Sequence, residues 1–516
     1  MRKKLTLVLF LSVAVFFKAQ AQNKITFDNV RQTYIRNSGQ IMDREELKGY
    51  FSFYITDKKD RKTNAYMIQI LDNNLNKVKE IEFEDDKDIQ ILESSYNNNA
   101  IMFVFYNSKE NTLEYRSYGF DGKIKSTYTK ELDKRSEALL VQTYNLKAEE
   151  GQNQGLFSVG DHGFTAVFPI KEKKYYSYEI NFFFTMQKKQ WAYEAVEEQE
   201  DKVASAAYLG ATDSLVIFEV LKKNSLFTKK MRSYLLGLNI FTGKKAFEIS
   251  TEEDEYKLFP MNISTLTGKS DFMVLGTYYD KDDRIAADKT LGLGVFTIDG
   301  KGKITSKKYN SWANDFGKFL NVNSKGKIDD IGYLYFHKLI QTSDGKIFAI
   351  GEGYKKVADG VGIALNILSG GGGTNNTKMK ITDLVFIQFN NSFGLENASI
   401  YEKRSSSLNL WGDFVSPHIL AAMIKAYGGF DYSFTQTDKN HDRFYVGYDD
   451  YEKSENYKGR TFNTISYADG KITTDKVTLD TKAKWMKIFP AKTGSVMIME
   501  YFKKEKKLEM RLEKMN

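Results

Sequence analysis

Short runs of apolar or alternating residues, separated by turns rich in glycine, asparagine and aspartate, fill most of this 516-residue chain. Residues 291–309 are a clear example, with an apolar run, an Asp-Gly turn at Asp299 and then a mostly polar run. Two such runs that flank an Asp-Gly turn predict a β-hairpin. The same arrangement recurs at residues 115–128, 235–249, 384–401 and 464–477. The chain is therefore predicted to be built from repeated β-hairpins.

A second kind of strand is apolar on both faces. Residues 100–106 read AIMFVFY, and similar runs occupy residues 214–220, 272–279, 347–350 and 495–502. A strand that is apolar on both faces has to be covered on both faces. Sheets packed face to face around a common axis meet this requirement, with the polar, lysine-bearing hairpin strands as exposed edges. The pattern favours one all-β domain, a β-propeller of four-stranded blades.

The spacing of the hairpins sets the expected number of blades. Three strand candidates follow the last hairpin, at residues 484–489, 495–502 and 506–512, and a lone candidate at residues 24–30 can supply a fourth. Pairing the two chain ends in this way would close the ring, so we expect eight blades, with seven as the alternative. Seven outer hairpins turn near Asn74, Asp121, Lys188, Thr242, Asp299, Asn391 and Asp469.

The chain is longer than eight minimal blades of ~40–45 residues require, so the surplus is expected in insertions. The propeller domain is predicted to span residues 22–516, with insertions at 309–332, 355–379 and 403–430. Each links either a fourth strand to the next blade or a second strand to a third. In an antiparallel blade these two connections share one end. We expect one face of the ring to carry the insertions, including helical ones.

The N-terminus has the order of a secretory signal peptide. Basic residues at positions 2–4 precede an apolar run at 5–17, and small residues follow at positions 19 and 21, so cleavage is expected after Ala21. The protein would then be exported, with the periplasm favoured over the extracellular space. The apolar run is shorter than the ~20 residues that cross a bilayer, so no transmembrane span is expected.

Composition narrows the range of partners. The chain has no cysteine, which excludes disulfides and a lipid anchor on cysteine. Its formal charge is +8, but four positive charges lie in residues 1–21, which contain no acid, so removing that segment leaves +4. Such a mixed surface does not favour nucleic acid. We expect a monomer that acts as a binding or scaffolding module for a protein or glycan of the cell envelope.

Two tryptophans in the insertions are candidates for ligand contact. Trp312 is followed by Asp315, and Trp411 by Asp413. Flat aromatic rings can stack on sugars while carboxylates accept sugar hydroxyls, although large aromatics also anchor loops. A helix predicted at residues 417–427 carries an apolar stripe that ends at Tyr427 and either covers the ring or binds a partner.

One loop has the spacing of a calcium site. Asp438, Asn440 and Asp442 place oxygen atoms at alternate positions. The loop is similar to the calcium loop of integrin-type propeller repeats, which implies Ca²⁺ as a cofactor, but Arg443 replaces the glycine of that family. An ordinary solvated hairpin turn is the alternative, and it would leave the protein without a cofactor.

No catalytic residue can be singled out. There are four histidines, no cysteine, and neither an HExxH nor a GxSxG motif. The alternative to a binding module is a carbohydrate-active enzyme, a glycosidase or lyase, that uses carboxylates in the central funnel, since glycosidases need only a carboxylate pair at the right separation. Whether the protein is an enzyme stays open, and binding is favoured.

Nearly the entire mature chain resembles secreted bacterial proteins of propeller-like repeat plan, rich in tyrosine, phenylalanine and lysine, that form a family of unknown function. The chain lacks the Gly-His and Trp-Asp pairs of WD40 blades and the double glycine of kelch repeats. The resemblance implies the fold and export. It implies no site residue.

Overall fold

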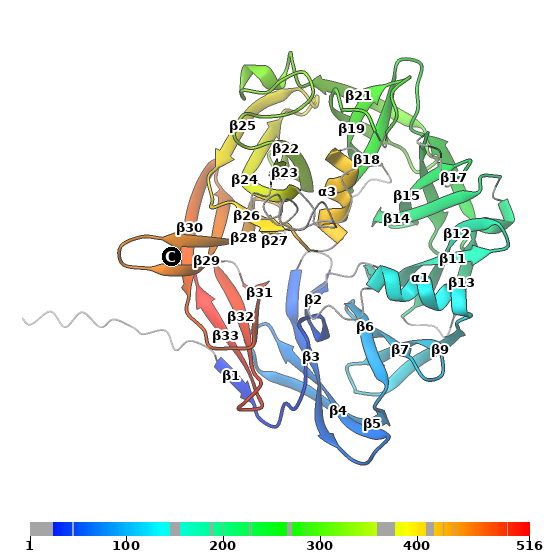
Figure 1. Ribbon diagram of the computed structural model, residues 1–516, viewed down its shortest axis with the longest axis vertical. Coiled ribbons are helices and arrows are strands. Elements are labelled where there is room, and N and C mark those ends of the chain that lie inside the picture. Colours follow the sequence, from blue (N-terminus) through cyan, green and yellow to red (C-terminus); the bar gives the residue numbers. More distant parts are fainter. Residues whose placement is uncertain are drawn as a thin grey trace, which may run out of the picture.

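The computed structural model describes residues 24–515 apart from 44–45, 145–154, 186–188, 199, 226–227, 229, 266–270, 286, 359–376, 409–416, 427, 439 and 493. The expected signal peptide, residues 1–21, lies outside the described residues. Antiparallel β-sheets make up most of the structure and surround a central region, which gives a propeller-like, all-β fold (Figure 1). No helix in the described part of the chain is long and apolar enough to cross a membrane.

Within each sheet, strands that are consecutive in sequence pair in order. One sheet contains β2 (Ser38–Asp43), β3 (Glu46–Lys58), β4 (Thr63–Asp72) and β5 (Lys77–Asp86), and the next contains β6 (Ile89–Tyr96), β7 (Ala100–Asn107), β8 (Thr112–Gly119) and β9 (Ile124–Glu131). A third sheet contains β18 (Tyr256–Thr265), β19 (Phe272–Asp280), β20 (Gly292–Ile298) and β21 (Ile304–Ser311). A fourth contains β22 (Tyr333–Gln341), β23 (Ile347–Ala358), β24 (Thr377–Phe389) and β25 (Leu395–Tyr401), with β26 (Ser406–Leu408) beside β24. A fifth contains β27 (Tyr432–Thr437), β28 (Arg443–Lys453), β29 (Lys458–Ala468) and β30 (Lys471–Leu479).

One further sheet has eight strands and divides into two sets of four. A single parallel pair, Tyr176 with Val203, joins the sets, while all other pairs in the sheet are antiparallel. The first set contains β10 (Leu156–Val159), β11 (Gly163–Glu172), β12 (Tyr175–Phe184) and β13 (Gln190–Glu194). The second contains β14 (Val203–Ala211), β15 (Leu215–Lys223), β16 (Arg232–Asn239) and β17 (Lys245–Ser250). Each set therefore repeats the pattern of the other sheets.

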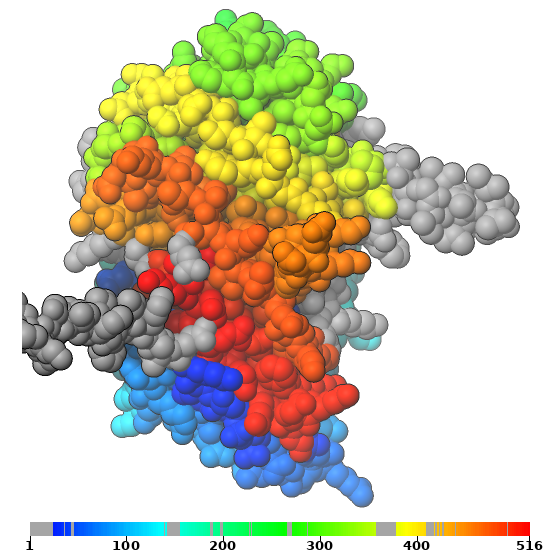
Figure 2. All heavy atoms as spheres, turned by 90° about the vertical axis from the view of Figure 1, so that its left-hand side faces the viewer, coloured from blue at the N-terminus to red at the C-terminus, as the bar shows by residue number. Residues whose placement is uncertain are grey.

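The last sheet combines both ends of the described chain. It contains β31 (Trp485–Pro490), β32 (Ser495–Phe502), β33 (Lys507–Lys514) and, from the N-terminus, β1 (Lys24–Phe27), which pairs antiparallel with β33. Phe27 is buried at 4% exposure in the core of this sheet. The pairing of the two chain ends predicted from the sequence is thus present, and Figure 2 shows N-terminal residues in blue beside C-terminal residues in red.

The predicted hairpins are confirmed. At each of the seven predicted turn positions, the flanking strands pair antiparallel: β4 with β5, β8 with β9, β12 with β13, β16 with β17, β20 with β21, β24 with β25, and β29 with β30. In the hairpin at 291–309, the Asp299 carboxylate accepts hydrogen bonds from the backbone N–H groups of Lys301 and Lys303. Such local bonds are the reason why Asp-Gly sequences fix tight turns.

Doubly apolar strands lie between two hydrophobic cores. In β7, Ile101, Phe103 and Phe105 pack into a core shared with β3 and β4, whereas Met102 and Val104 pack into another shared with β10 and β11. Because successive side chains point to opposite faces of a strand, one strand contributes to both cores. Burying a large apolar side chain contributes about 1.5–3 kcal/mol, so these strands hold neighbouring sheets together.

Connecting segments carry the helices. The described helices are α1 (Lys134–Tyr144), α3 (Pro417–Ala426) and the short 3-10 helices η1 (Ile35–Asn37), η2 (Ala195–Glu198) and η3 (Phe316–Lys318). Figure 1 shows α1 and α3 on the same side of the sheets. The insertion predicted at 355–379 is shorter than expected, because β23 continues to Ala358 and β24 begins at Thr377.

Helix α3 leads the chain into the central region. Its buried residues Leu420, Ala421 and Ile424 pack in a core with Tyr354 of β23. The helix ends where Gly428 adopts a positive φ of 65°, and the Gly429 N–H donates to the Ile424 carbonyl at 2.9 Å. Glycine tolerates this left-handed conformation, which makes it a common helix terminator. The turn directs the next residues into β27.

Candidate functional site

The first strands of five strand sets, β2, β6, β10, β27 and β31, line a cavity of about 840 Å³. Figure 1 shows β2, β6, β27 and β31 around the centre of the molecule. Cavities of ~300–1,000 Å³ accommodate small molecules. Hydroxyl and amide groups are frequent among the lining side chains: Ser38, Gln40, Ser94, Ser95, Ser158 and Ser433. These groups can exchange hydrogen bonds with a polar ligand.

The cavity continues toward both ends of the central region. Asp431, Asp449 and Arg460 also line a second space of about 370 Å³, beside the linking segment 404–406. A third space of about 120 Å³ shares Met42, Tyr96 and Ser158 with the cavity and lies beside the turn after β6. A strand begins and ends at opposite ends of a sheet, so the segment before β27 and the turn after β6 mark opposite ends of the cavity.

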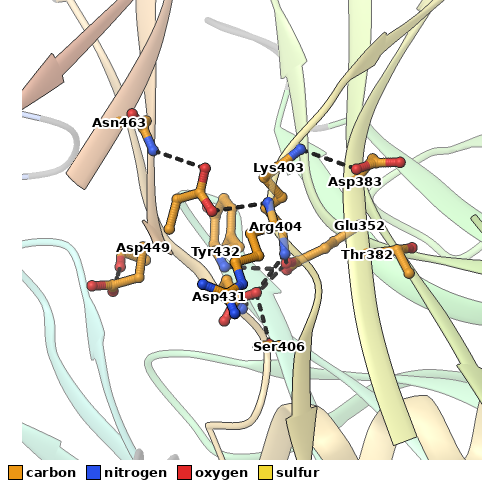
Figure 3. Close-up of polar contacts among 12 residues, drawn as sticks. Glu352, Thr382, Asp383, Lys403, Arg404, Ser406, Asp431, Tyr432, Asp449 and Asn463 are labelled. Carbon is orange, nitrogen blue, oxygen red and sulfur yellow. Dashed lines mark hydrogen bonds and ion pairs between the residues drawn. The ribbon is translucent and has the colours of Figure 1, made fainter. Parts of the chain in front are cut away.

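A buried carboxylate, Glu352 of β23, organises one wall (Figure 3). It accepts hydrogen bonds from the backbone N–H groups of Asp431 at 3.2 Å and Tyr432 at 3.1 Å. It also pairs with the Lys403 ammonium at 3.1 Å and the His337 Nε2 at 3.2 Å. Four donors therefore converge on one carboxyl group. Glu352 fixes the start of β27, which is the strand that brings Asp431 to the cavity.

Lys403 lies between two carboxylates. Its ammonium contacts both Glu352 and Asp431, and the Ser406 hydroxyl donates to Asp431 at 2.9 Å (Figure 3). Burial lowers the pKa of Lys403, but the two carboxylates outweigh burial and raise the pKa above 10.5, so the lysine stays charged. One cation cannot neutralise two buried anions. Burial raises the pKa of Glu352, and it raises the pKa of Asp431 to about 6 even beside Lys403.

Two further carboxylates at the 370 Å³ space have donors of their own. Asp449 forms an ion pair with Arg460 at 2.9 Å and accepts a hydrogen bond from Ser433 Oγ at 3.2 Å. Asp450 accepts a hydrogen bond from the Arg404 backbone N–H at 2.9 Å, and the Arg404 guanidinium lies 4.4 Å from the ring centre of Tyr451. Both carboxylates therefore already accept hydrogen bonds from the protein itself.

Lys487 of β31 differs from the other charged groups of the cavity. It is enclosed by protein but keeps a partly accessible surface in the cavity. Its ammonium lies 4.7 Å from the ring centre of Phe489, and no carboxylate among the described residues pairs with it. Burial lowers the pKa of Lys487 to about 8. The cavity thus contains a cation whose charge no described side chain balances.

Two of the predicted ligand contacts, Trp312 and Asp315, have structural roles. Trp312 is 3% exposed in a hydrophobic core, and its indole N–H donates to Thr290 Oγ1 at 3.0 Å. This burial leaves little of the ring accessible, and sugar stacking on Trp312 stays a prediction. Asp315 accepts a hydrogen bond from the Ser311 backbone N–H at 2.8 Å and stabilises the turn that precedes η3. Large aromatic rings anchor loops because burying their apolar surface stabilises the folded state.

Three other predicted ligand contacts, Trp411, Asp413 and Tyr427, lie outside the described residues. Their involvement in binding stays a prediction.

The loop with calcium-site spacing contains a tight turn. The Asp438 carboxylate accepts hydrogen bonds from the backbone N–H groups of Asp442 at 2.8 Å and Arg443 at 3.1 Å. The Asp442 carboxylate contacts the Ser343 hydroxyl, and Asn440 is exposed. In the described ranges, no group of three or more His, Cys, Asp and Glu side chains is placed to hold a metal ion. The contacts fit the solvated hairpin turn, and calcium binding there stays a prediction.

The sequence reasoning missed the residues that form the cavity wall. Glu352 stands in the run IFAIGEGY and Lys487 in WMKIFP, each as a charged residue within an otherwise apolar strand. A charge is costly to bury without a partner, so such positions are informative. Nothing comparable identifies Lys403 or Asp431, which lie in polar segments.

The fold and the cavity define a propeller-like, all-β protein with a polar central cavity. The chain belongs to a family of unknown function, DUF6770, whose model matches residues 1–516. No curated protein matches the chain.

Solved structures show only distant likeness. A prolyl endopeptidase is 8% identical, with a TM-score of 0.36, over 88% of this chain and 54% of its own. The WD40 domain of SCAP from fission yeast is 7% identical, with a TM-score of 0.35, over 95% of this chain and 97% of its own. The chain therefore spans about half the length of the endopeptidase. At these values neither likeness bears on activity.

Proposed function

We propose that this chain is an exported, eight-bladed propeller that binds a glycan of the cell envelope in its central cavity. Residues 1–21 have the features of an export signal, and they support a periplasmic location. The described residues form seven sheets, one of them divisible into two sets of four strands, which supports the count of eight. The pairing of β1 with β33 supports ring closure by the chain ends.

The hydroxyl-rich cavity of about 840 Å³ is the observation that carries this proposal. Sugars present many hydroxyl groups, and small polar side chains such as Ser94, Ser95 and Ser158 can donate to them and accept from them. Aromatic residues at the wall, Phe430 and Phe489, add apolar surface suited to the faces of sugar rings. The linking segment 404–406 at one end of the cavity supports entry from the insertion-bearing face.

Binding is favoured over hydrolysis because the carboxylates of the cavity wall already form hydrogen bonds or ion pairs within the protein. Glu93 accepts hydrogen bonds from the backbone N–H groups of Gly155 and Leu156. Asp431 is paired with Lys403, and Asp449 with Arg460. Carboxylates held in this way stabilise the wall.

Carbohydrate hydrolysis is the second candidate function. Asp431 and Asp449 line the same cavity, and the backbone N–H of Asp449 donates to the Asp431 carbonyl at 2.9 Å, so the two residues are cross-strand neighbours. Burial raises the pKa of Asp431 to about 6, as a general acid requires, while Asp449 is paired with Arg460. Under this hypothesis Asp431 acts as the acid and Asp449 as its partner.

A glycan array probed with residues 22–516 tests the binding proposal. Ser95→Trp and Ser158→Trp would fill the cavity, whereas Ser392→Trp, on an exposed turn, is the matched control. We expect binding to at least one glycan, lost in both cavity variants and kept in the control. Failure to bind any glycan, or binding that survives both cavity variants, would contradict the proposal. Circular dichroism checks that each variant is folded.

The same glycans test the second candidate. Release of reducing ends by the unchanged chain, lost in Asp431→Asn and in Asp449→Asn, would establish hydrolysis. A bound glycan that stays intact would eliminate it.

A further inference from the structure

The charged groups that line the central cavity differ in whether a hydrogen bond or an ion pair balances their charge. Glu93 is held by two backbone N–H groups, Asp431 by Lys403, and Asp449 by Arg460. The Lys487 side chain forms neither an ion pair nor a hydrogen bond within the described chain, which sets it apart from these other lining charges. Its contact with Phe489 leaves the ammonium without a counter-charge. A cation enclosed in this way is costly unless an anion arrives to pair with it.

The position of Lys487 makes it available to a ligand. It lies on β31, the first strand of its sheet, between Trp485 and Phe489, which are buried. β31 contacts β2, whose residues Ser38 and Gln40 also line the cavity. The ammonium therefore faces a space that hydroxyl and amide groups share. No described carboxylate shifts the pKa of Lys487, so none lies close enough to neutralise it.

We propose that the ligand of the central cavity is an anionic sugar whose charged group pairs with Lys487. This inference rests on the proposed glycan-binding function. The hydroxyl-bearing lining matches the neutral part of such a ligand, and the single unbalanced ammonium matches one carboxylate or sulfate group. Charge-assisted pairs between an ammonium and an oxyanion are roughly twice as strong as neutral hydrogen bonds. Lys487 is thus the residue that selects anionic over neutral sugars.

Accessibility of the amine can be tested without a ligand. Reductive methylation with formaldehyde and a borane, read by mass spectrometry, reports how fast each lysine reacts. We expect Lys487 to react at least tenfold faster than Lys403, because Lys403 is sealed between Glu352 and Asp431. Burial lowers the pKa of Lys487 to about 8, which increases its reactive neutral fraction. A Lys487 as inert as Lys403 would overturn the inference.

Calorimetry with three matched ligands tests the selectivity. The probes are tetragalacturonic acid, its neutral methyl ester and a sulfated tetrasaccharide of similar length. We expect at least one acidic probe to bind tenfold or more tightly than the ester. Lys487→Met should remove this preference, while Lys487→Arg should retain it. Carboxylate and sulfate are distinguished by which acidic probe binds.

The failures of the two proposals are distinguishable. Equal binding of acidic and neutral sugars that Ser95→Trp abolishes would retain the glycan site and overturn the role of Lys487. Absence of binding to all three probes would overturn the inference, and the glycan array then decides the proposed function by itself. An acidic preference that persists in Lys487→Met would also overturn the inference.

Discussion

The imidazole of His337 lies parallel to the ring of Tyr432, with centroids 4.2 Å apart and an angle of 3° between the planes. The two residues are joined a second time through Glu352, which contacts the His337 Nε2 and accepts a hydrogen bond from the Tyr432 backbone N–H. The buried His337 Nδ1 has no hydrogen-bond partner in the described chain. This geometry fits a neutral ring that carries its proton on Nε2. The stack connects β22 to the start of β27.

His337 is expected to stay neutral in mild acid. Burial, with Lys425 and Lys403 nearby, holds its pKa well below 6.5. The unfolded chain takes up this proton near pH 6.5, so below that pH the unfolded state binds more protons and the free energy of unfolding falls. Nitrogen NMR of the ring, assigned with His337→Gln, should show the Nε2–H tautomer at pH 5.5. An imidazolium signal at that pH would contradict the prediction.

Removing Lys403 should destabilise the fold strongly. Lys403→Met leaves Glu352 and Asp431 buried without their cation, and breaking a buried pair costs about 3–5 kcal/mol. Urea denaturation at pH 7 measures the loss. It should be smaller at pH 5, because the raised pKa values let the carboxylates take protons.

An exposed ion pair provides the control for this experiment. Lys476 pairs with Glu452 at 2.6 Å on the surface. Lys476→Met should destabilise the fold far less than Lys403→Met, since solvent screens such pairs. Equal losses in the two variants would refute a special role for the buried network.

Glu219 should make stability depend on pH. It is buried on β15, with the Ser233 hydroxyl 3.3 Å away, and burial raises its pKa from 4.5 to about 8. Between these values the folded state holds a proton that the unfolded state has released. The free energy of unfolding should therefore fall as pH rises from 4.5 to 8, by about 1.4 kcal/mol per pH unit.

Glu219→Gln removes this titration and provides the comparison. Its stability relative to the unchanged chain should increase from pH 5 to pH 8 and then level off. A constant difference across this range would mean that Glu219 is not buried as a neutral acid. Urea denaturation at pH 5, 6.5 and 8 is sufficient.

Phe27→Ala should weaken the pairing of the chain ends. Phe27 is 4% exposed and packs in a core with Tyr50 and Trp485, so truncation is expected to cost about 3–5 kcal/mol. Phe241, which is 45% exposed, is the control, and Phe241→Ala should cost less than about 1 kcal/mol. Hydrogen exchange of the β33 amides should rise in the first variant and stay unchanged in the second. Similar stability losses would contradict the role of β1.

Local chemistry explains why so much of the fold could be predicted. The hairpin at Asp299 depends on alternation and on a turn residue that hydrogen-bonds its own neighbours, and both are written in adjacent positions. The apolar run of β7 likewise had to be covered on both faces. The burial of Trp312 could not be predicted, because its neighbours in the sequence are polar. Its burial depends on Thr290 and on the core beneath it, which local sequence does not reveal.

The strands, the turns and the pairing of the two ends can be read from the sequence, because each depends on short-range periodicity or on an unmatched strand. The cavity and its wall arise only when the chain is folded. Glu352, Lys403 and Asp431 come from three separate segments, and their convergence depends on how sheets and α3 pack. Lys487 is distinguished by the lack of a carboxylate beside it in the described structure. The electrostatics of a site depend on distances between residues remote in sequence, and folding sets those distances.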